Sequence, residues 1–447
     1  MQLRLAISVL GAIFSTRQDH SQSESSSLRL RSLALTVALI AAFALTAFAA
    51  GDSPNKKSQA AEHWVGSWAT GPAGSSGAAK QYSNQTLRLI VHTSVGGNAV
   101  RIKISNTFGS DPLVIGAAHI ALRAQAASVV AGTDHGVTFS GKPSFTIPAG
   151  GLIVSDPVNL QVQPLTDLAV SIYLPSTATA STTHLLALQT SYVASGTGDF
   201  TAAVNLPGAT TITSWDFLTG VDVSEQATGG TIVALGDSIT DGANSTIDTN
   251  QRWPSLLAAR LQEDKTLSQL GVLDEGIIGN RILHPTETTF GNLFGPAALA
   301  RFDRDVLSQA GVKYVIVLLG INDIGHPGGS APDSEKVTAD EIIAGHLQLI
   351  ARAHEKGLKI YGCTLLPFED TTLKNFYSPE KDKLRQAVNE WMRTSGAYDA
   401  VIDFDRVVRD PGHPSRILPA YDGGDHLHPS DAGHKAMANA INLDLFR

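Results

Sequence analysis

Cysteine is almost absent from this sequence of 447 residues, because Cys363 is the only one. A single cysteine excludes a disulfide within the chain, so the fold must be stabilised by packing rather than by cross-links. Cys363 stands in the apolar stretch "LKIYGCTLLP". There we expect a buried small hydrophobic side chain rather than a catalytic thiol.

An excess of positive charge is also missing. The chain has 33 Lys and Arg against 41 Asp and Glu, which gives a net charge of −8 at pH 7. No basic patch suggests a nucleic-acid partner, and 43% hydrophobic with 17% charged residues is typical of soluble globular proteins. A chain of this length exceeds what one hydrophobic core usually organises, so we expect two domains after a leader.

Long apolar runs are rare and lie near the N-terminus. There an arginine pair precedes "LALTVALIAAFAL", which predicts a signal peptide within residues 1–50 and cleavage near Ala49 and Ala50. The run is short for a spanning helix, although an uncleaved anchor stays an alternative. We therefore expect a secreted or periplasmic protein with no stable membrane association after cleavage. Residues 1–28 are a long n-region or an over-extended start, and residues 51–61 are expected to be a linker.

Residues 62–224 lack any long helical period and alternate apolar with polar positions instead. In "QTLRLIVHTSVGGNAVRIKISNTFG", Leu87, Leu89 and Val91 share one face, and the glycine-rich residues 96–98 predict a hairpin turn into the next strand. Further short runs are separated by Gly, Pro, Ser and Asp at the spacing of an all-β sandwich. We expect a jelly-roll-like β sandwich as the first domain.

The hydrophobic period changes after a predicted linker at residues 225–230. Over residues 231–447, apolar strands alternate with amphipathic helices, which predicts an α/β fold whose strands are buried on both faces. Helix signals support this interpretation, because Thr338 and Glu341 form a capping-box pattern and Ser378 precedes a proline.

Polar residues follow three of the predicted strands, and in an open parallel sheet ligands bind outside the carboxyl ends of the strands. Ser238 follows the first strand in "TIVALGDSITDG", Gly279 the second in "EGIIGNR", and Asn322 the third in "LLGINDIG". Ser238 is a candidate nucleophile. The N–H of Gly279 and the amide of Asn322 are candidate donors to one ligand oxygen. Taken singly, each is also explained as an ordinary turn residue.

A fourth polar cluster lies in "GGDHLHPSDAGH". The i, i+3 spacing of Asp425 and His428 can place the carboxylate beside the imidazole, where it fixes the tautomer and stabilises the cation. His426 and His428 could instead form a metal pair, but no HExxH or paired-cysteine motif accompanies them, so we expect no metal and no cofactor. Together these residues predict an acyl-transfer site with nucleophile Ser238, base His428, orienting Asp425, and an oxyanion hole from Ser238, Gly279 and Asn322.

A GxSxG elbow is also missing, which counts against an α/β-hydrolase. Residues 231–447 instead resemble the SGNH hydrolases, also called the GDSL lipases and esterases. "GDSIT" matches the nucleophile block of this family, although Ile239 stands where the name GDSL has Leu. "GNR" matches the block with the oxyanion glycine, and "GIND" matches the block with the oxyanion asparagine. "DHLHP" matches the final block, which holds the Asp-His dyad. The resemblance implies a flavodoxin-like three-layer α/β/α fold, a metal-free Ser-His-Asp mechanism and ester substrates.

A narrower resemblance concerns the substrate. "HWVGSWATGP", "LARFDRDVL" and "GDHLHPSDAGHKAMA" are similar to stretches of a secreted, two-domain, xylan-esterase-like branch of that family, which favours carbohydrate esters. We therefore expect a secreted serine esterase of short-chain acyl esters, acetyl above all, with a small-molecule or polysaccharide ester as its partner. A longer-chain lipase, an acyltransferase, and a carbohydrate-binding protein with a vestigial hydrolase domain are the alternatives, and the oligomeric state is left open.

Other polar and aromatic residues have two interpretations each. Four neighbours of the candidate residues either shape a substrate pocket or are polar turn residues: Asp237, Asn280, Arg281 and Asp323. Four aromatic residues of the first domain either contact a polysaccharide or belong to the core: Trp64, Trp68, Tyr82 and Trp215.

Overall fold

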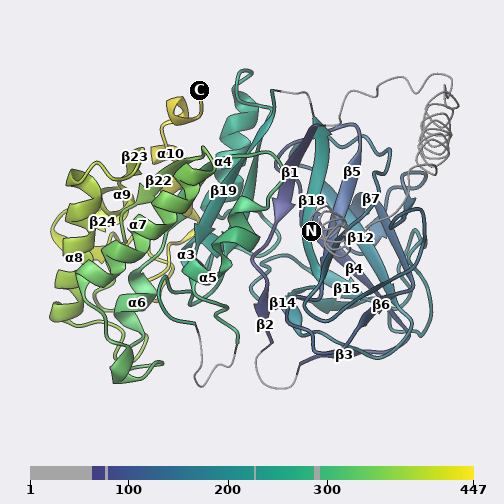
Figure 1. Cartoon of the computed structure of the whole chain (residues 1–447), viewed down its shortest axis with the longest axis horizontal. Helices are drawn as coiled ribbons and strands as arrows, with labels where there is room; N and C mark the ends of the chain where they lie inside the picture. Colours follow the sequence, from purple (N-terminus) through teal and green to yellow (C-terminus); the bar gives the residue numbers. More distant parts are fainter. Residues whose placement is uncertain (1–62, 76–78, 226–227, 286–291) are drawn as a thin grey trace, which may run out of the picture. The chain divides into compact units, whose positions relative to one another are not determined.

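The computed structural model describes residues 63–75, 79–225, 228–285 and 292–447 (Figure 1). The expected signal peptide and the linker after it lie outside the described residues, as does part of the second linker. Residues Glu62–Arg447 belong to one compact unit. The expected boundary between two domains therefore stays a prediction. Below, residues 63–225 are called the β half and residues 228–447 the α/β half.

The β half consists of antiparallel strands in two main sheets. The first sheet has the order β1 (His63–Ala69), β18 (Leu218–Glu225), β5 (Val100–Ser105), β11 (Leu152–Val154). The second has the order β16 (Thr210–Ile212), β15 (Ser191–Val193), β4 (Gln85–His92), β12 (Asp167–Leu174), β7 (Ala117–Gln125), β8 (Ser128–Val129), with β9 (His135–Val137) also on β7. Smaller sheets join β10 (Phe145–Ile147) to β6 (Leu113–Ile115), β13 (Ala178–Thr179) to β3 (Gln81–Tyr82), and β17 (Trp215–Asp216) to β14 (Thr182–His184) and β2 (Ala73–Gly74).

The predicted alternation in this half is confirmed, but the predicted hairpin is wrong. Leu87, Leu89 and Val91 of β4 lie in one core with residues of β5 and β18, as expected for a sandwich. However, β4 and β5 belong to different sheets. The glycine pair between them is not a hairpin turn, because Gly97 exchanges backbone hydrogen bonds with the distant Val162. The chain crosses here from one sheet to the other.

The aromatic residues proposed as polysaccharide contacts are mostly core residues. Trp68, Tyr82 and Trp215 are buried, with side chains no more than 8% exposed. Trp68 and Trp215 pack edge to face, and the indole N–H of Trp215 donates to the carbonyl of Ile90. The binding interpretation is therefore wrong for these three residues. Trp64 is partly buried and lies under the guanidinium of Arg101.

The α/β half has a five-stranded parallel sheet of flavodoxin-like order (Figure 1). The order is β20 (Leu270–Gly276), β19 (Gly230–Gly236), β21 (Val312–Leu318), β22 (Lys359–Cys363), β23 (Ala400–Ile402). The helices are α3 (Ser238–Asp241), α4 (Trp253–Glu263), α5 (Ala298–Phe302), α6 (Ile321–Gly325), α7 (Ala339–Glu355), α8 (Pro379–Thr394), α9 (Phe404–Val408) and α10 (Asp431–Ala440). A π-helix (Asp303–Leu307), two 3₁₀ helices (Asp333–Glu335 and Leu443–Phe446) and a hairpin of β24 (Arg409–Asp410) and β25 (His413–Ile417) complete it.

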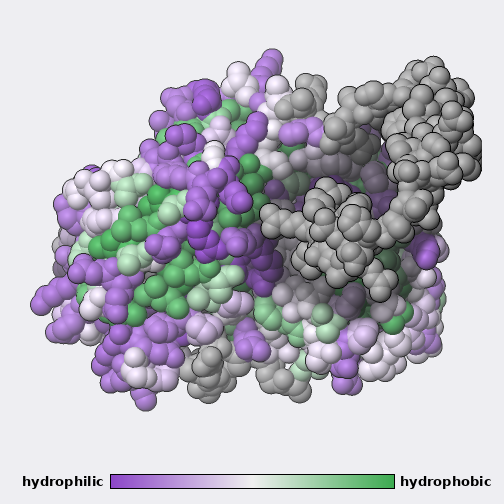
Figure 2. All heavy atoms as spheres, viewed as in Figure 1, coloured by the Kyte–Doolittle hydropathy of each residue, from purple (hydrophilic) through white to green (hydrophobic). Residues whose placement is uncertain are grey.

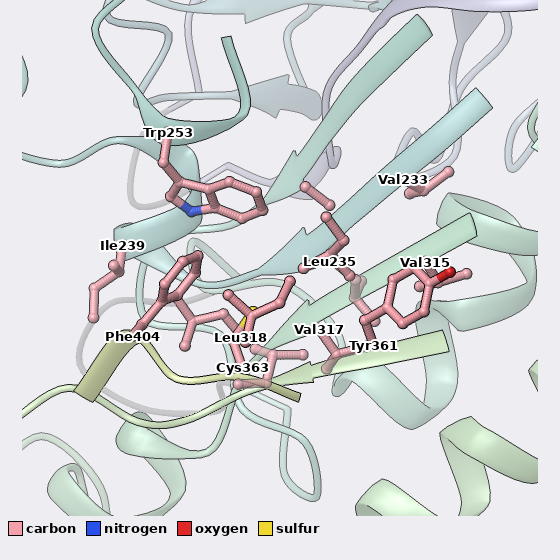
Figure 3. Packing of buried hydrophobic residues seen from close by; sticks show 14 of the residues in the cluster. Val233, Leu235, Ile239, Trp253, Val315, Val317, Leu318, Tyr361, Cys363 and Phe404 are labelled. Atoms are coloured by element: carbon pink, nitrogen blue, oxygen red, sulfur yellow. The ribbon is translucent and has the colours of Figure 1, made fainter. Parts of the chain in front are cut away.

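The sheet of this half is covered on both faces, as the sequence predicts. Helices α4, α9 and α10 form one layer, and α5, α7 and α8 form the other. Between sheet and helices lies a continuous hydrophobic core, in which the indole of Trp253 packs edge-on against Phe404 (Figure 3). Cys363 is buried in this core, which confirms its predicted role. The fold is the three-layer α/β/α arrangement that carries its site at the carboxyl ends of the strands.

The outer surface is mainly hydrophilic in the view of Figure 2, with hydrophobic residues gathered over part of the α/β half. Among the helices that the structure describes, none has both the length and the apolar character that a membrane crossing requires.

Candidate functional site

Ser238 lies at the carboxyl end of β19, where the strand turns into α3. Asp237 caps this short helix, because its carboxylate accepts the N–H of Ile239 at 3.0 Å. The turn requires Gly236, since a Cβ there would come within 2.0 Å of the hydroxyl of Thr240. The sequence "GDS" therefore sets both the tightness of the turn and the position of the serine hydroxyl.

Two hydrogen bonds link Ser238 to His428 and Asp425. The hydroxyl oxygen of Ser238 lies 2.8 Å from Nε2 of His428, and Nδ1 of His428 lies 2.6 Å from Asp425. The other oxygen of Asp425 accepts the backbone N–H of His428 at 2.8 Å and of Leu427 at 3.1 Å. Burial opposes ionisation of Asp425, but its bonds to His428 and to these N–H groups outweigh burial and hold its pKa well below the usual range. The carboxylate is therefore an anion that orients the imidazole.

The expected oxyanion donors lie on neighbouring loops of the sheet. Gly279 adopts φ +70°. A Cβ there would approach the ring of Phe294 within 2.4 Å. Both the positive φ and this close approach therefore require glycine. Within the described residues, the backbone N–H groups of Ser238 and Gly279 donate to no other protein atom. The amide of Asn322 donates to the carbonyl of Asn280 at 3.1 Å and so ties the third strand to the loop after the second.

Asn280 anchors the loop that carries Gly279. Its amide nitrogen donates to the carbonyls of Phe294 and Pro296 at 2.7 and 2.8 Å, and its oxygen accepts from Arg301 at 3.0 Å. Asn280 is buried, so all three of its side-chain bonds are made inside the protein. This loop is therefore held rigidly, as a preorganised donor requires.

The other three residues suggested as pocket lining are also buried. Arg281 pairs with Glu335 at 2.6 Å, and the carboxylate of Asp323 accepts the N–H groups of Ile282 and Leu283. Asp237 keeps one oxygen without a partner among the described residues. Whether any of these side chains contacts a substrate stays a prediction.

Burial changes the charge state of the carboxyl groups around the serine. It raises the pKa of Asp237 to about 7 and that of Asp323 to about 6. Asp425 is thus the carboxyl of this site whose charge is stabilised, whereas burial makes Asp237 and Asp323 easier to protonate than an ordinary aspartate. Such perturbed pairs of carboxyl groups are typical of functional sites.

Arg301 was not predicted from the sequence, yet it joins three parts of the site. Its guanidinium is fully buried and donates to the carbonyls of Gly236 and Glu275, each at 2.8 Å, as well as to Asn280. Asp305 accepts from it at 3.0 Å, one turn later in the π-helix. Arg301 therefore fixes the ends of β19 and β20 relative to the Gly279 loop. The available signal was an Arg and an Asp at i, i+4 within the charged amphipathic stretch "LARFDRDVL".

His326 was also missed. Its Nε2 lies 3.2 Å from the carbonyl oxygen of Gly279, and its Nδ1 contacts the hydroxyl of Ser330. Burial lowers the pKa of His326 to about 4, so the ring is neutral near pH 7. The neutral tautomer with a proton on Nε2 donates to Gly279 and accepts from Ser330. His326 thus supports the Gly279 loop in addition to Asn280.

The alternative of a metal pair is not supported by the side-chain contacts. His428 faces Ser238, whereas His426 pairs with Asp422. In the described ranges, no group of three or more His, Cys, Asp or Glu side chains is arranged to hold a metal ion.

The comparisons with known proteins concern the α/β half. Residues 234–436 match the model of the GDSL-like lipase/acylhydrolase family. A comparison with curated proteins finds no match. Similar solved structures include a lipolytic protein of the G-D-S-L family from Desulfitobacterium hafniense (19% identity, 47% of this chain and 97% of that chain, TM-score 0.35). Another is a catalytic mutant of an acetylxylan esterase from Geobacillus stearothermophilus (21% identity, 47% and 93%, TM-score 0.35).

The family match lies within the α/β half, where Ser238, His428 and Asp425 stand at the carboxyl edge of the parallel sheet. Residues 234–436 match the GDSL-like lipase/acylhydrolase family, and this match supports a hydrolase.

Proposed function

We propose that the chain is a secreted serine esterase that cleaves carboxylic esters through an acyl-enzyme, with short acyl groups on carbohydrate as its substrates. The observation that carries the proposal is the continuous hydrogen-bonded chain from Ser238 through His428 to Asp425. A serine hydroxyl is a weak nucleophile until a base accepts its proton, and this geometry supplies that base. The signal peptide predicted within residues 1–50 supports secretion, and the resemblance to xylan-esterase-like proteins supports carbohydrate esters.

The first step is acylation. Nε2 of His428 accepts the proton of Ser238 as the serine oxygen attacks the ester carbonyl. The resulting oxyanion accepts hydrogen bonds from the N–H groups of Ser238 and Gly279 and from the amide of Asn322, each contributing about 3 kcal/mol. His428 then gives its proton to the leaving alcohol, and the acyl group stays on Ser238.

Deacylation repeats these steps with water. Nε2 of His428 takes a proton from water as the water oxygen attacks the acyl carbon, and the same donors stabilise the second oxyanion. The bond between the acyl carbon and the oxygen of Ser238 then breaks, His428 returns the proton to that oxygen, and the carboxylic acid leaves. Asp425 stabilises the imidazolium in both steps.

The test compares the mature protein with Ser238→Ala on p-nitrophenyl acetate, butyrate and octanoate and on acetylated xylan, with a chelator present. Ser245→Ala, a buried serine in the next loop, is the matched control. We expect Ser238→Ala to abolish ester turnover and Ser245→Ala and chelator to leave it intact. Acetate release from xylan would support the carbohydrate substrate, whereas a preference for octanoate would favour a longer-chain lipase.

Two further results would change the proposal. Acyl transfer to an added sugar in preference to water would assign an acyltransferase. No turnover of any ester by the folded protein would contradict the proposed activity.

A further inference from the structure

The β half reaches the nucleophile helix through one buried side chain. His184 of β14 places Nε2 at 3.0 Å from the carboxylate of Asp241, the last residue of α3. Ser238 is the first residue of that helix. Both His184 and Asp241 are buried. A residue of the β half is thus bonded to the four-residue helix that carries the serine.

The contacts of His184 define its charge. Nδ1 lies 2.9 Å from the carbonyl oxygen of Gly71, which can only accept a hydrogen bond. Nε2 faces the carboxylate of Asp241. Two acceptors require two N–H groups, so the ring is an imidazolium paired with a carboxylate. Burial opposes this charge, but Asp241 outweighs burial and raises the pKa of His184.

The buried carboxylate of Asp241 depends on His184 for its hydrogen bond and for most of its charge compensation. One of its oxygens has no hydrogen-bond partner among the described residues. The other also faces Arg252, at 3.6 Å, beyond hydrogen-bond distance. Arg252 is shared with Asp274 of β20 and with the carbonyl of Ala187. Loss of His184 would therefore leave a buried carboxylate poorly compensated, and such a charge moves toward water or other partners if it can.

Movement of Asp241 would move Ser238 as well. A Cβ on Gly276 would lie 2.3 Å from the backbone nitrogen of Asp241, so the helix rests directly on the end of β20. The helix has only four residues, so a displacement of Asp241 at its end is passed on to Ser238 at its start. The hydrogen bond of 2.8 Å between Ser238 and His428 depends on the position of this helix.

We propose that His184 is a positioning residue for Ser238, and that the β half thereby takes part in catalysis by holding the nucleophile helix through a buried ion pair with Asp241. This inference rests on the proposed role of Ser238 as the nucleophile. It assigns the β half a task in the active site, distinct from polysaccharide binding.

The principal test is His184→Phe in the full chain. Phenylalanine keeps a ring beside Trp215, whose centroid is 5.6 Å from that of His184, but it removes both N–H groups. The matched control is Ser94→Ala. It removes a different buried bond between the halves, from the N–H of Val272 in β20 to the hydroxyl of Ser94 at 2.9 Å. Each variant is measured for kcat and KM on p-nitrophenyl acetate, for the rate of Ser238 phosphonylation by a fluorophosphonate, and for thermal unfolding.

We expect His184→Phe to lower kcat and the phosphonylation rate together by about 10- to 100-fold, with little change in KM, since small misplacements of a reacting group have effects of this size. Ser94→Ala should lower the unfolding temperature while kcat stays near that of the parent. His184→Gln, which keeps one donor, should lie between. If His184→Phe has parental kcat, or if both variants lower kcat equally, the inference is wrong.

A double-mutant cycle of His184→Phe and Asp241→Asn separates the coupling of the two residues from a general loss of folding. In an Asp241→Asn background the buried charge is gone, so the additional His184→Phe change should lower kcat far less than it does alone. An equal loss in both backgrounds would contradict coupling through this pair. Ser238→Ala separates the two levels of inference. If that variant stays active, the proposed function fails, whereas an inactive Ser238→Ala with a fully active His184→Phe refutes the positioning role alone.

Discussion

Replacement of Asp425 by asparagine tests whether the carboxylate selects the tautomer of His428. In the parent protein one oxygen of Asp425 accepts two backbone N–H groups, at 2.8 and 3.1 Å, and the other accepts Nδ1–H of His428. An asparagine that keeps the two backbone bonds turns its NH₂ group toward Nδ1. That nitrogen must then accept, which places the proton on Nε2. A protonated Nε2 cannot take the proton of Ser238.

The expected loss follows from the cost of the other amide orientation. Turning the amide around restores the productive tautomer but leaves two backbone N–H groups without an acceptor, at about 1–3 kcal/mol each. A total of about 2–6 kcal/mol lowers the productive population by about 30-fold to 10⁴-fold, since 1.36 kcal/mol is a factor of ten. The imidazolium also loses its counter-charge. We therefore expect kcat to fall by about 10³- to 10⁴-fold, with KM little changed.

The assay is hydrolysis of p-nitrophenyl acetate at pH 8 with Asp422→Asn as the control. Asp422 lies in the same loop and accepts backbone N–H groups from Gly424 and His426, but it makes no bond to His428. Removal of its charge should leave kcat near the parental value. If Asp425→Asn keeps kcat within tenfold of the parent while thermal unfolding shows an intact fold, the tautomer argument is refuted.

Three further predictions follow from the packing and from the pKa shifts. Gly279→Ala should lower kcat by about 100-fold in the same assay, because φ +70° and the nearby ring of Phe294 leave no room for a methyl group; parental kcat would contradict this. Burial lowers the pKa of His346 to about 3, so only the unfolded chain gains this proton as the pH falls below about 6.5. Urea titrations should therefore show His346→Leu gaining about 3 kcal/mol relative to the parent between pH 7 and pH 4, and parallel pH dependences would refute the shift. Residues 228–447 expressed alone should not give a soluble, active esterase, and normal kcat of this fragment would show that the β half is dispensable.

Local signals account for the parts of the fold that the sequence predicted well. Helix α7 begins where Thr338 and Glu341 cap each other, and α8 begins after the cap Ser378, so both helices begin where the sequence signals place them. The hairpin prediction is wrong because it used only the local glycine pair, whereas Gly97 forms its backbone bonds with the distant Val162. Gly96 and Gly97 fit closely against residues 162–164 and 223–224 instead of reversing the chain. Nothing in the stretch itself indicates those partners.

The candidate site was predictable for a topological reason, and its supports were not. In a parallel sheet the loops after successive strands meet at one edge, so polar residues after the strands are expected to converge. Arg301 and His326 instead form hydrogen bonds with backbone carbonyls. Arg301 donates to the carbonyls of Gly236 and Glu275, and His326 contacts the carbonyl of Gly279. A carbonyl has no sequence signature. Asp305, the carboxylate partner of Arg301, also lies in a π-helix, a form that residue spacing does not reveal.

The same reasoning explains why the sequence predicts a separate β domain but says nothing of its contacts with the α/β half. The periodicity of the strands predicts a β sandwich. It does not indicate which residues of the sandwich contact the α/β half. In the structure, Ser94 accepts the N–H of Val272 on β20, and Gly271 packs so closely on Gly66 that a Cβ would lie 2.0 Å from its carbonyl oxygen. The β half thus covers the strand edge that an isolated parallel sheet would expose. Because His184 meets Asp241 at the same interface, the contact that protects the sheet also places a charge against the nucleophile helix. One surface therefore has two separable tasks: contacts such as that of Ser94 stabilise the fold, and the contact of His184 holds the helix of Ser238.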